Sequence, residues 1–294
     1  MYIFISESYR KSDQFFHRRF QMAYTESFVL SNGVKMPKLG LGVWKAKEGG
    51  DVERAVETAI RAGYRSIDTA TIYQNESGVQ KGIAASGIAR DELFITTKVW
   101  NDDHGYDSTL KAFEESCQRL QVDYVDLYLI HWPVTGKFIE TWKALERLYE
   151  EKVVRAIGVS NFHIHHLEKL ATKANIAPMV NQFEFHPYLT QEELRAYCRE
   201  HQIQVEAYSP LMHGHFTEEK TILDIANKVN RTPAQVLLRW NIQHGVVTIP
   251  KSVTKERIIE NAQIFDFELA DEDMKRLDQL NRNHRFGMDP DTFV

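Results

Sequence analysis

Four ionisable side chains in the first half of the chain could together deliver a proton to a carbonyl oxygen. They are Asp68, Tyr73, Lys98 and His131. An ammonium paired with a carboxylate and placed near a phenol favours the phenolate, which lowers the phenol pKa from about 10 toward neutrality. Such a phenol is a general acid near neutral pH, and a neutral histidine beside it can orient the carbonyl group. This chemistry requires a fold that brings the four side chains together.

The elements that would position these residues alternate regularly along the chain. Short runs rich in β-branched and aromatic residues are predicted to be strands: residues 39–43, 64–68, 93–98, 125–131, 153–159, 179–185, 204–208 and 246–249. Amphipathic stretches between them are predicted to be helices: residues 52–62, 77–86, 107–120, 138–151, 164–173, 191–201, 221–229 and 233–244. Helical crossovers imply parallel strands, so the pattern predicts an α/β fold, a closed (β/α)8 TIM barrel.

In such a barrel, polar residues at the carboxyl ends of the strands face the active site. Singly, a strand-end lysine or aspartate is most often part of an ion pair that closes the barrel, and a lone histidine is usually hydrogen-bonded in the core. Here Asp68, Lys98 and His131 end three successive strands. Because adjacent strands lie about 5 Å apart, Asp68 and Lys98 can pair, with Tyr73 near the ammonium.

The two ends of the chain differ from the repeating pattern. Residues 1–21 show no clear period and are interpreted as an extension, poorly ordered or else docked as a helix, so residues 22–294 would form a single barrel domain. Asn32 and Gly33 lie between short apolar runs, which predicts a β-hairpin before the barrel. Two extra helices are predicted after the last strand, at residues 255–262 and 271–280.

The composition excludes several kinds of partner. The net charge of -5 comes from mixed acidic and basic residues, without the single-sign run typical of nucleic-acid or membrane-surface binding. No apolar run approaches the roughly 20 residues that span a bilayer, and the N-terminus lacks the features of a signal peptide. The two cysteines, Cys117 and Cys198, do not form a disulfide framework, which fits a reducing compartment. We therefore expect a cytoplasmic protein, and a monomer, since no surface pattern demands assembly.

Two other motifs resemble binding sites. Gly40 and Gly42 supply only two of the three glycines of a dinucleotide-binding turn, and no helix begins there. The histidines His163, His165 and His166 resemble a metal site, but no aspartate or glutamate accompanies them at ligand spacing. They are interpreted as solvent-exposed residues at the start of a helix, and no metal site is predicted.

The sequence around the first two of the four residues resembles a known signature. Residues 63–70, followed by Tyr73, Asn75 and Glu76, look like the first signature of the aldo-keto reductases, except that Gln80 stands where that family usually has glycine. Asp68, Tyr73, Lys98 and His131 match the family's catalytic tetrad in order and context. The resemblance runs from about Phe28 to the C-terminus, nearly the whole chain.

The resemblance implies NADPH as cofactor and assigns residues to its parts. Ser160, Asn161 and Gln182 would bind the nicotinamide carboxamide, and Tyr208 would stack on the ring. Ser209 and Leu211 would lie along the pyrophosphate. The adenosine end would be held by Lys251, Ser252 and Arg257 at the 2′-phosphate, and by Asn261 with Glu260 at the adenine. The substrate pocket would be lined by Trp44, Trp100, Trp132 and His131.

The expected activity follows from the same resemblance. The loops after His131 and Leu211 and the tail beyond Asn283 are short, so an open pocket is expected. This is similar to the short-loop microbial members, of the glyoxal, methylglyoxal and 2,5-diketo-D-gluconate reductase type, which reduce small aldehydes, ketones and dicarbonyls. The alternatives are a nicotinamide-binding sensor or scaffold with little turnover, and a cofactor-free barrel isomerase.

Overall fold

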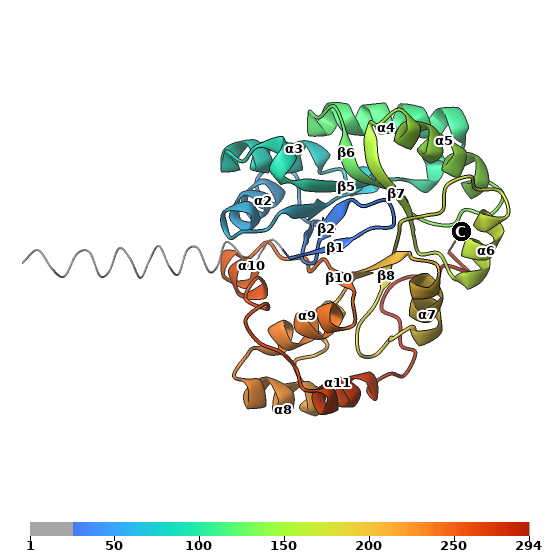
Figure 1. Ribbon diagram of the computed structural model, residues 1–294. Helices are drawn as coiled ribbons and strands as arrows, with labels where there is room; N and C mark the ends of the chain where they lie inside the picture. Colours follow the sequence, from blue (N-terminus) through green and yellow to red (C-terminus); the bar gives the residue numbers. More distant parts are fainter. Residues whose placement is uncertain (1–25, 294) are drawn as a thin grey trace, which may run out of the picture.

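The computed structural model describes residues 26–293, so the predicted extension at residues 1–21 lies outside the described part of the chain. Eight parallel strands form one sheet, in the order β10-β9-β8-β7-β6-β5-β4-β3 (Figure 1). The strands are β3 (Leu41–Gly42), β4 (Ser66–Asp68), β5 (Phe94–Val99), β6 (Val125–Ile130), β7 (Val154–Ser160), β8 (Val180–Glu184), β9 (Gln204–Tyr208) and β10 (Val247–Thr248). All eight overlap the predicted runs, with bounds that differ by up to two residues at either end.

The first and last strands of the sheet meet, which closes the barrel. Parallel bridges join Leu39 to Thr248 and Gly42 to Lys251. The amide of Gly42 donates to the carbonyl of Pro250 at 3.2 Å. A Cβ on Gly42 would lie 2.9 Å from the Ile249 carbonyl oxygen, so this closure needs glycine. Gly42 therefore serves close packing of the backbone and not a dinucleotide-binding turn. The prediction of a (β/α)8 barrel is confirmed.

Helices follow the strands as predicted. They are α2 (Asp51–Arg61), α3 (Glu76–Ser86), α4 (Tyr106–Leu120), α5 (Phe138–Glu150), α6 (Ile164–Ala171), α7 (Glu192–Glu200), α8 (Lys220–Val229), α9 (Pro233–Gln243), α10 (Lys255–Asn261) and α11 (Asp271–Asp278). The start of α9 shows how sequence sets a boundary. Thr232 accepts from the amide of Gln235, whose side chain accepts in return from the amide of Thr232, and Pro233 takes the first helical position.

The interior of the barrel is apolar apart from one end. Every residue of β6 is buried, as expected for strands covered on both faces. Asp126 in that strand is compensated by Arg90 and Arg155, each at 2.6–2.7 Å. A group of buried polar side chains also lies at the carboxyl ends of the strands, among them Asp68, Lys98 and Gln182.

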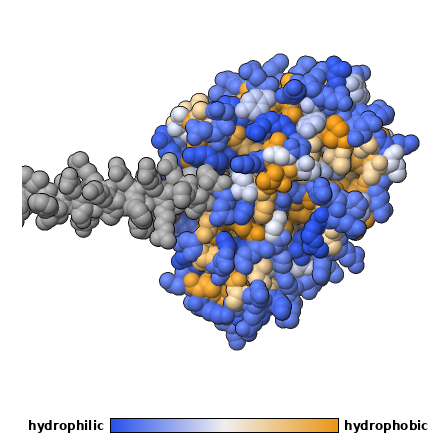
Figure 2. Space-filling view, viewed as in Figure 1, coloured by the Kyte–Doolittle hydropathy of each residue, from blue (hydrophilic) through white to orange (hydrophobic). Residues whose placement is uncertain are grey.

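The predicted hairpin lies at the opposite end of the barrel. It pairs β1 (Ser27–Val29) with β2 (Lys35–Pro37), and Gly33 takes a positive φ of 86° in the turn. Asn32 in the turn donates to the carbonyl of Arg155 at 2.9 Å, at the start of β7. The hairpin therefore covers the amino ends of the strands. The face seen in Figure 2 is mostly hydrophilic, with apolar residues near its centre.

None of the helices within residues 26–293 combines the length and apolar character needed to cross a membrane.

Candidate active site

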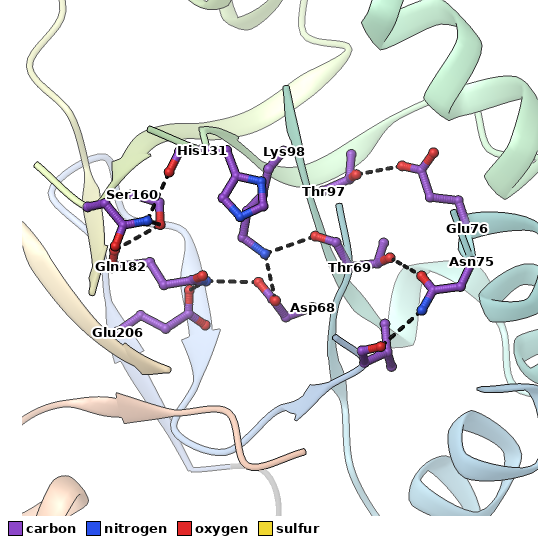
Figure 3. Close-up of polar contacts among 12 residues, drawn as sticks. Asp68, Thr69, Asn75, Glu76, Thr97, Lys98, His131, Ser160, Gln182 and Glu206 are labelled. Atoms are coloured by element: carbon purple, nitrogen blue, oxygen red, sulfur yellow. Dashed lines mark hydrogen bonds and ion pairs between the residues drawn. The ribbon is translucent and has the colours of Figure 1, made fainter. Parts of the chain in front are cut away.

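The four ionisable residues converge at the carboxyl ends of neighbouring strands. Asp68 ends β4, Tyr73 ends a short 3-10 helix at Thr71–Tyr73, Lys98 is in β5, and His131 directly follows β6. Parallel pairing of β4 with β5 and of β5 with β6 fixes their spacing. Figure 3 shows Lys98 directed toward Asp68 and Thr69, with Gln182 and Glu206 beyond Asp68.

Lys98 is fully buried, and its ammonium is held by two oxygens. The Nζ atom donates to Asp68 Oδ1 at 2.6 Å and to the Thr69 carbonyl at 2.9 Å. Burial lowers the pKa of Lys98, but the charge and hydrogen bond of Asp68 and the charges of Tyr73 and Glu206 together raise that pKa more, so the ammonium persists. The same Nζ lies 5.1 Å from the centre of the Tyr73 ring.

The phenol of Tyr73 does not have the lowered pKa expected from the sequence. Burial raises the pKa of Tyr73, and the charge of Lys98 lowers it by less, so the net direction is upward. The lysine charge can be inferred from the sequence, but the desolvation of the phenol depends on burial that the sequence does not reveal. At neutral pH Tyr73 is therefore a protonated hydrogen-bond donor beside a permanent cation.

His131 stands between Tyr73 and two tryptophans. Its ring is 5.6 Å from that of Tyr73 and 5.1 Å from that of Trp100, both edge to face. Burial, with a smaller contribution from Lys98, lowers the pKa of His131 well below its usual value, so the ring is neutral. Its Nδ1 atom is buried without a hydrogen-bond partner in the described part of the chain. A neutral ring of this kind can hydrogen-bond a carbonyl oxygen.

A buried carboxyl group that sequence reasoning missed adjoins the ion pair. The amide nitrogen of Gln182 donates to Asp68 Oδ2 at 2.8 Å and to Glu206 Oε2 at 2.7 Å. Burial, and then the charge of Asp68, raises the pKa of Glu206. The signal was present in the sequence, since an acidic residue inside the buried run 204–208 is unusual.

The residues expected at the nicotinamide form one hydrogen-bonded group. Asn161 donates to the His131 carbonyl at 3.0 Å and to Ser160 Oγ at 3.1 Å, and it accepts from the Tyr208 hydroxyl at 2.8 Å. Ser160 Oγ donates to the Gln182 carbonyl at 2.9 Å. Asn161 has a positive φ of 64°, a conformation that asparagine tolerates and that recurs at functional sites.

The residues expected along the pyrophosphate lie on an unusual loop. Ser209 has a φ of 50°, and its hydroxyl is 2.9 Å from Nε2 of His213. His213 also has a positive φ, of 51°. Leu211, between them, is partly buried against the core. The loop is thus held in a strained form that presents Ser209 at the strand end.

The residues expected at the adenosine end lie just before α10 and along it. Lys251 and Arg257 are exposed, and neither forms an ion pair within residues 26–293. Ser252 Oγ accepts from the amide of Thr254 at 3.1 Å, so it caps the turn before the helix. Of the two residues expected at the adenine, Glu260 accepts from Thr232 Oγ1 at 2.8 Å, and Asn261 is buried. Two unpaired cations at a helix start suit a phosphate.

The expected tryptophans do not all lie together. Trp100 and Trp132 flank His131, whereas Trp44 is 45% exposed and contacts His213, with ring centres 6.2 Å apart. The ring of Phe293, near the C-terminus, lies 4.5 Å from that of Trp132. The short tail therefore contacts the tryptophans on this side, and the openness of the rest of the pocket stays a prediction.

A second buried carboxylate, at the end of β8, anchors that tail. Glu184 accepts from the amides of Phe286 at 2.7 Å and Gly287 at 2.9 Å, and from Nε2 of His186 at 2.9 Å. Burial raises the pKa of Glu184, but these hydrogen bonds lower it more, so the carboxylate stays charged. A Cβ at residue 287 would lie 2.9 Å from Glu184 Oε2, so a larger residue there would press on the carboxylate.

Comparison with known proteins agrees with this geometry. The model of the aldo/keto reductase family matches residues 38–282. Glyoxal reductase of Bacillus subtilis is 60% identical over 269 residues, which cover 92% of this chain and 98% of that protein. Methylglyoxal reductase DkgA of Salmonella typhimurium is 46% identical over 276 residues, 92% of this chain and 99% of that protein.

Solved structures agree as well. The crystal structure of a Gox0644 mutant in complex with NADPH has a TM-score of 0.88 and 43% sequence identity, and the match covers 92% of this chain and 99% of that one. The family model, the similar proteins and the barrel fold together show that the chain belongs to the aldo/keto reductase family of oxidoreductases.

Proposed function

We propose that the protein reduces the carbonyl group of small aldehydes, ketones or dicarbonyls such as glyoxal and methylglyoxal, with NADPH as the reductant. The observation that carries the proposal is the Lys98–Asp68 ion pair, 2.6 Å long, directly beneath a protonated Tyr73 and beside a neutral His131. A carbonyl reduction needs one hydride at carbon and one proton at oxygen. The protein must supply the proton and hold the carbonyl in place.

Tyr73 is the proposed proton donor. Its raised pKa keeps the phenol protonated before the reaction, and the nearby Lys98 ammonium stabilises the phenolate as the proton leaves. Asp68 accepts a hydrogen bond from that ammonium at 2.6 Å and keeps it in place. The acid is thus supported by a buried charge that needs no rearrangement during the reaction.

His131 is the proposed orienting group. Because its ring is neutral, it can donate one N–H to the carbonyl oxygen without competing for the proton that Tyr73 delivers. Trp100 and Trp132 restrict the ring from the side, so the hydrogen bond has a fixed direction. A carbonyl held between His131 and Tyr73 presents one face to the opposite side of the pocket.

NADPH, when bound, supplies the hydride. The nicotinamide would be held by the group of Ser160, Asn161, Gln182 and Tyr208. Because the amide nitrogen of Gln182 already donates to Asp68 and Glu206, its amide oxygen is the atom that can accept from a carboxamide N–H. Lys251 and Arg257, which have no ion-pair partner within residues 26–293, suit the 2′-phosphate. The NADPH complex of the similar Gox0644 protein supports this choice.

The substrate class is inferred from the pocket and from the relatives. The aromatic side chains of Trp100, Trp132 and Phe293 favour a small substrate with little polar surface beyond its carbonyl groups. Two similar proteins are named for glyoxal and methylglyoxal reduction. The same names favour reduction over oxidation as the assayed direction.

The test is to follow NADPH oxidation by absorbance with a panel of small aldehydes, ketones and dicarbonyls, in parallel with direct measurement of NADPH binding. Turnover with at least one dicarbonyl is expected. NADPH binding without turnover of any compound in the panel would contradict the enzyme proposal and favour a sensor. Absence of NADPH binding would contradict the cofactor assignment itself.

A further inference from the structure

Three histidines at the start of α6 surround one carboxylate from the C-terminal tail. Asp291 Oδ1 lies 2.9 Å from His163 Nδ1, 3.4 Å from His165 Nε2 and 3.8 Å from His166 Nε2. One ligand atom from each of the four residues falls within 4.8 Å of every other. We propose that these four side chains bind a divalent cation of the zinc class and thereby fasten the C-terminal tail beside the substrate pocket.

The distances match the geometry that such an ion requires. Bonds of about 2.0–2.1 Å to imidazole nitrogen and carboxylate oxygen place the ligands of a tetrahedral zinc about 3.3–3.4 Å apart. The three distances from Asp291 Oδ1, at 2.9, 3.4 and 3.8 Å, lie on both sides of that value. Shifts of less than about half an ångström along each edge would complete this part of the tetrahedron.

The kind of donor selects the kind of metal. Three imidazole nitrogens and one carboxylate oxygen suit Zn²⁺, Co²⁺, Ni²⁺ or Cu²⁺, whereas Mg²⁺ and Ca²⁺ prefer sites built of oxygen alone. The side chain of His165 is 60% exposed and that of Asp291 46% exposed, so an ion can reach the site from solvent. His166 is largely buried against Phe138 and Phe162, which fixes one side of the site.

Metal binding must displace the 2.9 Å hydrogen bond between His163 Nδ1 and Asp291 Oδ1, together with two longer contacts. The amide of His163 donates to Nδ1 of His166 at 3.2 Å, so coordination through Nε2 of His166 shifts that ring's proton to Nδ1 and ends this hydrogen bond. Arg285 lies 3.5 Å from Nε2 of His163 and must turn away when that nitrogen carries the proton. Both contacts are at the long end of hydrogen-bond geometry, and coordination bonds replace them.

The site would connect two parts of the molecule that are far apart in sequence. His163, His165 and His166 lie just after β7, while Asp291 lies on the tail. Phe293, two residues beyond Asp291, packs on Trp132 at 4.5 Å. An ion at Asp291 would therefore hold Phe293 in place against Trp132. That consequence for the pocket rests on the proposed function, whereas metal binding does not.

The experiment measures metal binding to the full chain after removal of metals, by calorimetry with Zn²⁺ and by visible absorption with Co²⁺. Wild type is expected to bind one ion per chain tightly, with Co²⁺ bands typical of tetrahedral coordination. His165→Ala and Asp291→Asn should each weaken binding by about 10-fold to 100-fold. Asp289→Asn makes the same charge change on the same tail, and His201→Ala removes an exposed histidine outside the cluster; both should bind like wild type.

Two results would overturn the site. One is wild-type binding no tighter than that of Asp291→Asn, which would leave only a hydrogen-bonded cluster. The other is equal weakening by Asp289→Asn or His201→Ala, which would indicate nonspecific binding. Thermal unfolding without metal verifies that each variant is folded, and the Co²⁺ spectrum of wild type tests coordination without any variant. If the bound ion also fixes Phe293 against Trp132, Zn²⁺ should change KM for a bulky aldehyde in wild type but not in Asp291→Asn.

Discussion

The ammonium of Lys98 lies 2.6 Å from the Asp68 carboxylate and 5.1 Å from the centre of the Tyr73 ring. A fully buried ion pair contributes little net stability, because the desolvation of both charges offsets their attraction. Its position under a phenol gives it a chemical role instead. The pair keeps one positive charge where a phenolate would form, while burial keeps Tyr73 protonated until then.

The first prediction concerns the pH dependence of reduction. The donor must be protonated, so kcat/KM falls as pH rises through the Tyr73 pKa, which burial raises above its usual value of about 10. His131 is neutral over the same range because its pKa is lowered. We therefore expect kcat/KM for a neutral aldehyde to be nearly constant from about pH 6 to pH 9. An alkaline limb near pH 7 would show that Lys98, not burial, sets the phenol pKa.

The second prediction concerns the buried Glu206. Its raised pKa means that the carboxyl is protonated in the folded protein, whereas the unfolded chain releases this proton above about pH 4. The contribution of Glu206 to stability is therefore full below about pH 4 and is lost as pH rises toward the folded pKa. Glu206→Gln should raise the free energy of unfolding by about 1–3 kcal/mol near pH 7, and by much less at pH 4. Urea unfolding at both pH values checks this. An equal change at both would assign the effect to packing.

The third prediction concerns the Glu184 anchor of the tail. Glu184→Gln replaces one acceptor oxygen by an amide nitrogen that cannot accept from Phe286 or Gly287, so the tail should detach from the pocket. Because Phe293 would leave Trp132, KM for methylglyoxal should change about 3-fold to 10-fold while kcat changes less. Glu193→Gln, on the exposed side of α7, is the matched control. A kcat loss without a change in KM would place Glu184 in the chemistry.

The fourth prediction concerns cofactor choice. Arg257→Ala should weaken NADPH binding by about 10-fold to 100-fold, the effect of one charge-assisted contact, and leave NADH nearly unchanged. Fluorescence titration with both cofactors measures the difference. Arg199→Ala, an exposed cation on α7, controls for net charge. Equal weakening of NADPH and NADH would make Arg257 a structural residue.

The fold could be predicted because its signals are local. Short apolar runs predict strands, and the amphipathic stretches between them predict helices. Eight strands that all pair in parallel leave few possible sheet topologies. The convergence of Asp68, Lys98 and His131 followed from strand order alone. The hairpin followed from Asn32 and Gly33, whose turn chemistry is also local.

The parts that could not be predicted depend on contacts between distant segments or on solvation. Asp291 is more than a hundred residues from His163, and nothing near either residue indicates that they meet. The tail position depends on two backbone amides bonded to Glu184, which leave no mark in composition. The direction of the Tyr73 pKa depends on how deeply the phenol is buried, which side-chain types do not reveal.

The most direct test of the proton-donor role is Tyr73→Phe, which removes one hydroxyl and keeps the ring. NADPH oxidation with methylglyoxal should slow by at least about 100-fold in kcat, the usual contribution of a general acid, while the Kd for NADPH stays within about twofold of wild type. Retention of most activity, or loss of NADPH binding in parallel with activity, would contradict the assignment of Tyr73 as the acid.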